Sequence, residues 1–141
     1  MVLLSAHGGG RGGAQRTSLA GDRLEEITAQ ARALVSAGRG RELMLVPGWW
    51  YVISAESFLD RLTKMPDVLE LAPQIRCPTL FVRGDREDAE NYPAERFRDC
   101  SGGTCDVEIV PDCDHFYVRR ENTICDLVAG WLARTLGLSE I

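Results

Sequence analysis

Apolar residues recur at helical spacing in two stretches of the first half of the chain. The longer stretch runs from Leu24 to Val35, and the shorter one runs through Phe58, Leu59 and Leu62. In the longer stretch Asp22 stands at the N-cap position with Glu25 three residues on, which is a variant of the capping box. Gly38 ends this longer pattern. The apolar positions that define it are Leu24, Ile27, Ala31, Leu34 and Val35.

The second half of the chain has a different pattern, beginning near Ile75. Two compact β-rich runs, 79–82 and 107–110, are each bounded by proline or glycine. A helix can start at Pro93 between them, and an amphipathic stripe occupies 122–136. Strand, helix, strand and helix with short connections predict a βαβα unit with a parallel sheet.

The remaining segments complete the expected organisation. A short apolar run at 2–6, stopped by three glycines, suits a buried strand that opens into a loop. Residues 17–75 are expected to be mainly helical, since they show no alternating strand pattern of any length.

Composition excludes several classes of function. The 141 residues, 45% of them hydrophobic, are enough for one domain with a sizeable core. A net charge of −5 gives no reason to expect nucleic acid or an anionic membrane as partner. No apolar run approaches the roughly 20 residues needed to span a bilayer, and the start lacks the basic region of a signal peptide. We therefore expect no nucleic acid, no membrane and a cytoplasmic location.

The cysteines indicate neither a disulfide framework nor a metal site. Their number, five, is odd, and reduced thiols are expected in the absence of a secretory signal. A small disulfide between Cys100 and Cys105 is the alternative. Cys100, Cys105, Cys113 and His115 lack the C-x2-C pairs of structural zinc sites, so we expect no metal and no cofactor.

Ionisable residues cluster at the ends of the two β-rich runs. Acids at 85–88 follow the first run, and Asp112, Asp114 and His115 follow the second. Ligands of open α/β sheets bind beyond the carboxyl ends of the strands, where neighbouring loops meet. An acid from one loop that bonds to the histidine of the other would fix the imidazole tautomer and stabilise the imidazolium.

These residues also resemble a known family. The run CPTLFVRG at 77–84, followed by acids and by YPAE at 92–95, resembles the penultimate strand and acid loop of α/β-hydrolases. The run VPDCDHF at 110–116 resembles their histidine loop, and Trp131 with Leu132 is in keeping with their last helix. The resemblance covers about residues 66–136.

The resemblance implies a partial α/β-hydrolase fold: a short parallel sheet with flanking helices, plus a helical cap. Residues 1–16 would be a strand and glycine-rich loop of the hydrolase core, with the strand following the nucleophile helix. Residues 17–75 would be the cap, and 76–141 the C-terminal βαβα part of the core.

The resemblance also implies roles for individual residues. His115 matches the general base. Asp88 is favoured as the acid, with Ala89 at the family's usual proline position, and Glu87 is the alternative if spacing from Gly84 matters more. The order of acid then histidine agrees with the family's order of serine, acid and histidine.

The nucleophile motif of that family is missing from these residues. No serine in the sequence is flanked by glycines as in G-x-S-x-G. A histidine and an acid without a nucleophile cannot transfer an acyl group by the covalent route. We therefore expect these residues to supply the acid and histidine to a serine-bearing half, and to be inactive without it.

Two further motifs admit both a functional and a structural interpretation. Trp49, Trp50 and Tyr51 either line an acyl pocket under the cap or pack in the core. The run HGGG at 7–10 matches an oxyanion motif of some esterases, but there it precedes the nucleophile elbow. A glycine-rich loop at a strand end is the alternative.

Three functional hypotheses remain open from the sequence. The first is a hydrolase part acting on a small-molecule ester or acyl substrate together with a nucleophile half. The second is a binding or interaction module that lost the chemistry, and the third is a general acid–base enzyme that uses His115 without a covalent step. An exposed strand edge at 2–6 would favour self-association or docking onto a second chain that carries the nucleophile half.

Overall fold

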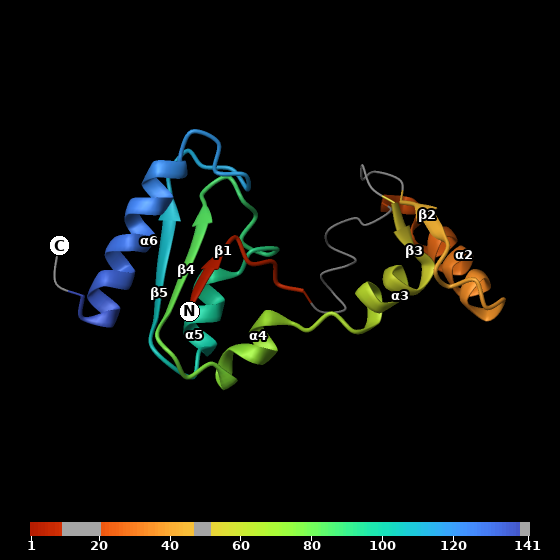
Figure 1. The fold of residues 1–141 in the computed structure, drawn as a ribbon, viewed down its shortest axis with the longest axis horizontal. Helices are drawn as coiled ribbons and strands as arrows, with labels where there is room; N and C mark the ends of the chain where they lie inside the picture. The colour runs from red at the N-terminus through yellow and green to blue at the C-terminus, as the bar shows by residue number, and fades with distance from the viewer. Residues whose placement is uncertain (10–20, 47–51, 139–141) are drawn as a thin grey trace. The chain divides into compact units, whose positions relative to one another are not determined.

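The computed structural model describes residues 1–9, 21–46 and 52–138 (Figure 1). These residues form two compact units. The sheet unit consists of Met1–Gly8 and Val68–Ile141, and the hairpin unit consists of Gly9–Asp67. Among the described residues, no helix is both long enough and apolar enough to cross a membrane.

The sheet unit contains a three-stranded parallel sheet, as the sequence predicts. Its order is β1 (Val2–Leu4), β4 (Thr79–Gly84) and β5 (Cys105–Val110), with β4 in the centre (Figure 1). Every residue of β4 is buried, because a central strand of a parallel sheet is covered on both faces. All three strands therefore end at the same edge of the sheet.

Helices cover the two faces of this sheet (Figure 1). Leu80 and Val82 of β4 pack on one face with α6 (Glu121–Leu136), which also donates a hydrogen bond of 2.7 Å from Trp131 Nε1 to Asp106 on β5. Phe81 faces the opposite side, where it packs with Phe97 of α5 (Ala94–Cys100). The alternation of side chains along β4 thus supplies both cores.

The segment before β4 also belongs to the sheet unit. It forms α4 (Val68–Leu71) and the short 3-10 helix η2 (Ala72–Gln74). Ala72 is fully buried beside Phe81. The division between the units therefore lies between Asp67 and Val68, whereas the sequence analysis extended the helical cap to residue 75.

The hairpin unit corrects one sequence prediction. It contains the 3-10 helix η1 (Gly21–Arg23), α2 (Leu24–Ser36), the antiparallel strands β2 (Leu43–Leu45) and β3 (Val52–Ser54), and α3 (Ala55–Thr63). The described residues of 17–75 are mainly helical, as expected, but they also contain these two short strands, which the sequence analysis did not predict. In β2 only the central Met44 is buried, but its two neighbours are leucines, so the sequence shows no alternation.

The start of α2 also differs from the prediction. Asp22 lies within η1, and Arg23 takes the N-cap position without a side-chain capping bond. The predicted capping box is therefore absent. The second helix has the cap that the first lacks, because Ser54 Oγ accepts a hydrogen bond of 3.2 Å from the backbone N–H of Ser57.

Gly84 permits the close approach of the loops that follow β4 and β5. A Cβ atom at this position would lie 2.1 Å from the carbonyl oxygen of Cys113, well inside van der Waals contact. The last residue of β4 must therefore be glycine for the histidine loop to lie against it.

We expect Gly84→Ala to lower the free energy of unfolding of the sheet unit by about 1–3 kcal/mol or more, through steric overlap with the Cys113 backbone. Hydrogen exchange of the β4 and β5 amides measures this. Gly130→Ala is the matched control in α6, where the new Cβ would lie 3.5 Å from the flexible end of Arg134 and improve helix propensity. Equal stability of the two variants would contradict the close-approach account.

Candidate acid–histidine site

The loops that follow β4 and β5 are joined by backbone and side-chain hydrogen bonds. The Asp85 N–H donates to the Val110 carbonyl at 3.0 Å, and the Arg86 N–H donates to the Cys113 carbonyl at 3.2 Å. Asp85 Oδ1 in turn accepts the Cys113 N–H at 3.1 Å. Hydrogen bonds from the Cys113 and Asp112 backbone lower the pKa of Asp85, because they stabilise the carboxylate. The acid loop and the histidine loop therefore form one connected structure.

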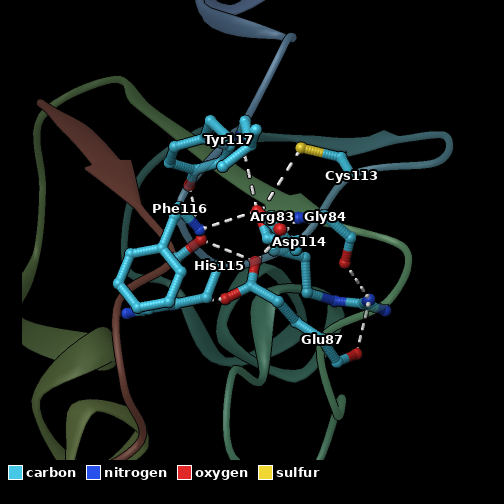
Figure 2. Close-up of polar contacts among 10 residues, drawn as sticks. Arg83, Gly84, Glu87, Cys113, Asp114, His115, Phe116 and Tyr117 are labelled. Atoms are coloured by element: carbon cyan, nitrogen blue, oxygen red, sulfur yellow. Dashed lines mark hydrogen bonds and ion pairs between the residues drawn. The ribbon is translucent and has the colours of Figure 1, made fainter.

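Within this structure, His115 bonds to Glu87. The distance from His115 Nδ1 to Glu87 Oε1 is 2.8 Å (Figure 2). The Glu87 side chain is only 2% exposed, whereas the His115 side chain is 47% exposed. A buried acid thus holds one nitrogen of an imidazole that is open to solvent.

The other oxygen of Glu87 is also engaged. Glu87 Oε2 accepts a hydrogen bond of 2.6 Å from Ser5 Oγ and one of 2.7 Å from the Gly84 N–H. Together with His115, this gives the carboxylate three donors. A buried carboxylate requires such partners, because burying it unpaired costs several kcal/mol.

Asp88, the acid that the sequence analysis favoured, does not contact His115. Its Oδ1 accepts the Glu90 N–H at 3.0 Å and its Oδ2 accepts the Asn91 side-chain amide at 2.9 Å, so it stabilises its own turn. The geometry instead favours the alternative, Glu87. A turn in which the Glu87 N–H bonds to the Gly84 carbonyl at 3.3 Å brings Glu87 back over the end of β4.

A buried arginine beneath this turn holds it in place. Arg83 is 7% exposed, and its Nη1 donates to the carbonyls of Gly84 and Glu87 at 3.1 and 3.4 Å (Figure 2). Its Nη2 pairs with Glu95 Oε1 at 2.7 Å. The guanidinium therefore connects the acid turn to the start of α5. No sequence pattern indicated this role, because Arg83 directly follows a β-rich run and was not expected to be buried.

Ser5 and Tyr117 extend the network of Glu87, and the sequence analysis assigned neither. Ser5 Oγ lies 2.5 Å from the Tyr117 hydroxyl as well as 2.6 Å from Glu87. Ser5 follows β1 directly, so the rule that neighbouring strand ends meet contained the signal for it. Tyr117 lies two residues after His115, where the sequence pattern carries no comparable signal.

The described residues of the glycine-rich run at 7–10 make structural contacts. The Gly8 N–H donates to the Asn91 carbonyl at 2.7 Å, and the Gly8 carbonyl accepts the Val68 N–H at 2.8 Å. The His7 ring packs edge-on against Tyr92, with 5.6 Å between ring centroids. The Gly8 amide is therefore already occupied, which argues against the oxyanion interpretation. Gly10 lies outside the described residues.

The remaining sequence predictions concern the aromatic cluster, metal sites and the cysteines. Trp49, Trp50 and Tyr51 lie outside the described residues. In the part of the chain that the structure describes, no three His, Cys, Asp or Glu side chains gather as a metal site. All five cysteines are free, and burial raises the pKa of the Cys113 thiol above its usual value.

The site can perform base chemistry at one atom. With Nδ1 bonded to a carboxylate, the neutral imidazole carries its proton on Nδ1 and leaves Nε2 as the acceptor. The nearby Ser5 hydroxyl donates to Glu87 and does not take the position of a nucleophile on His115.

Comparisons with protein-family models, curated proteins and solved structures find no match to this chain.

We expect Glu87→Ala to lower the free energy of unfolding of the sheet unit by about 1.5–3 kcal/mol, because Ser5, Gly84 and His115 all lose a charged acceptor. Urea unfolding with hydrogen exchange of β4 amides measures this. Asp88→Ala is the matched control, with a smaller loss from one exposed turn. A larger loss in Asp88→Ala would show that Glu87 is not the acid on which this site depends.

Proposed function

We propose that these residues form the acid and histidine part of a serine-type α/β-hydrolase that acts on a small-molecule ester or related acyl substrate. The observation that carries the proposal is the bond between the buried Glu87 and the exposed His115. The function requires a serine nucleophile from outside these 141 residues.

The environment of each group suits its proposed role. A triad acid is buried and bonds to Nδ1, which orients the ring and stabilises the imidazolium that forms during the reaction. Glu87 meets this description, with all three of its donors in place. The general base must reach a separate nucleophile, and the His115 side chain is 47% exposed, with Nδ1 the nitrogen that Glu87 holds.

The outer edge of β1 offers a place for the nucleophile part. The Met1 carbonyl and the Ser5 N–H bond to β4, so the backbone polar groups of Val2 and Leu4 face the other way. No described strand pairs with that side. In the family that the sequence resembles, the nucleophile strand precedes the strand matched by β1. We therefore place the missing strand on this edge.

A fluorophosphonate probe tests the proposal, since it reacts preferentially with activated serines. The tagged chain is isolated from the cells in which it naturally occurs, exposed to the probe, and analysed by mass spectrometry. We expect a labelled serine on the same polypeptide or on one that co-purifies. Its labelling rate should fall on the order of 10³-fold or more in His115→Ala and Glu87→Gln, because both variants remove the base or its orienting acid.

Asp88→Asn serves as the control for this experiment, because Asp88 contacts only its own turn. It should label at the rate of the unmodified protein. Labelling that persists in His115→Ala, or that is absent throughout, would reject the hydrolase proposal and favour a module without this chemistry.

The free edge of β1 leads to a separate expectation for the purified chain. Unpaired strand edges with apolar side chains promote pairing with another chain, and Leu4 is 47% exposed. We expect concentration-dependent self-association in analytical ultracentrifugation, weakened by Leu4→Lys. Leu45→Lys changes a leucine of the hairpin unit that is even more exposed, at 67%, and should leave association unaltered. A chain that stays monomeric at every concentration would contradict this.

A further inference from the structure

We propose that Ser5 and Tyr117 are positioning residues, whose hydroxyls form a chain that fixes the Glu87 carboxylate in the orientation that holds His115. The catalytic meaning of this chain rests on the proposed function. The chain joins three separate parts of the sheet unit: Ser5 follows β1, Glu87 follows β4, and Tyr117 follows β5.

The direction of the hydrogen bonds follows from the donors available. The Glu87 carboxylate only accepts, so Ser5 uses its single proton in the bond of 2.6 Å to Oε2. Ser5 Oγ must then accept the proton of the Tyr117 hydroxyl, 2.5 Å away. Protons thus point from Tyr117 to Ser5 and from Ser5 to Glu87.

Glu87 needs this chain because its own torsion does not orient the carboxylate. The terminal torsion of glutamate is broad, so hydrogen bonds decide which way the two oxygens point. His115 holds Oε1, while Ser5 and the Gly84 N–H hold Oε2. Without Ser5, a single amide would hold Oε2, and the carboxylate plane would turn more freely away from His115.

Tyr117 acts through Ser5. A serine hydroxyl rotates to suit its partners, so an isolated Ser5 would distribute its proton over several directions. The Tyr117 donor occupies a lone pair of Ser5 Oγ and leaves its proton for Glu87, and such chains strengthen each bond. Burial raises the pKa of Tyr117, which keeps the phenol protonated as a donor at neutral pH.

The backbone at both residues supports a specific role. Ser5 and Tyr117 have φ values of 43° and 56°, in the left-handed region that residues other than glycine rarely adopt. Such conformations cost energy and concentrate where side chains must be aimed at functional groups. Here the Ser5 hydroxyl bonds to the Glu87 carboxylate, and the Tyr117 hydroxyl bonds to Ser5.

Nitrogen-15 NMR of the His115 imidazole in the purified chain tests the proposal at a pH where the ring is neutral. In the unmodified protein we expect the Nδ1–H tautomer and a downfield Nδ1–H proton. Ser5→Ala should raise the fraction of the Nε2–H tautomer by up to roughly tenfold, because the Glu87 carboxylate is then held less firmly toward Nδ1 and the loss of one hydrogen bond to a charged group sets the upper bound. Tyr117→Phe should shift the ratio in the same direction by a smaller factor.

The matched control is Tyr92→Phe. The Tyr92 ring lies 5.1 Å from the His115 ring, so this variant also removes a phenolic hydroxyl beside the histidine, but one outside the chain. It should leave the tautomer ratio unchanged. Because Tyr117 acts through Ser5, the double variant should match Ser5→Ala alone.

Equal effects of Tyr117→Phe and Tyr92→Phe would overturn the proposal, as would additive effects in the double variant. Tyr117→Phe removes one oxygen only, so it keeps the test decisive even if Ser5→Ala fails to fold. The serine-labelling experiment separates the two proposals. If the variants shift the His115 tautomer ratio as expected but no serine is labelled, the hydrolase function alone is rejected. If labelling depends on His115 but Ser5→Ala and Tyr117→Phe leave the tautomer ratio unaltered, the hydroxyl chain alone is rejected.

Discussion

Burial of the Glu87 carboxylate is the constraint on which the rest of the site depends. A charged group with 2% exposure persists only with several donors, and these must come from whatever backbone and side chains lie within reach. They come from β1, from the end of β4 and from the loop after β5. One acid therefore ties together three segments that are far apart in the sequence.

The sheet makes this arrangement possible. Parallel strands end at one edge, and the glycine at the end of β4 lets the histidine loop approach to within the space that a Cβ would fill. Arg83 then holds the acid turn by donating hydrogen bonds to two of its carbonyl groups. The result is a buried acid bonded to a half-exposed histidine, which is the property that the hydrolase proposal uses.

Much of the sheet unit was predictable from local pattern. The β-rich runs around Phe81 and Val107 and the amphipathic stripe through Trp131 carry strong periodic signals, and each became the expected element. Local pattern failed where an element was too short to show a period, as in the strand around Met44, and where a helix began without the expected cap at Asp22.

The sequence by itself determined that acids and a histidine follow neighbouring strands, because strand-forming runs and the ionisable residues after them are local features. The sequence could not decide whether Glu87 or Asp88 bonds to His115, because the two acids are adjacent in one turn. Only the tertiary structure decided which of the two contacts His115, since the turn closed by Gly84 directs Glu87 to the histidine and leaves Asp88 bonded within its own turn. The hydrogen bonds of Ser5 and Tyr117 likewise join distant segments. The position of Ser5 after a strand placed it near the site, but only the tertiary structure showed its partners and the contribution of Tyr117.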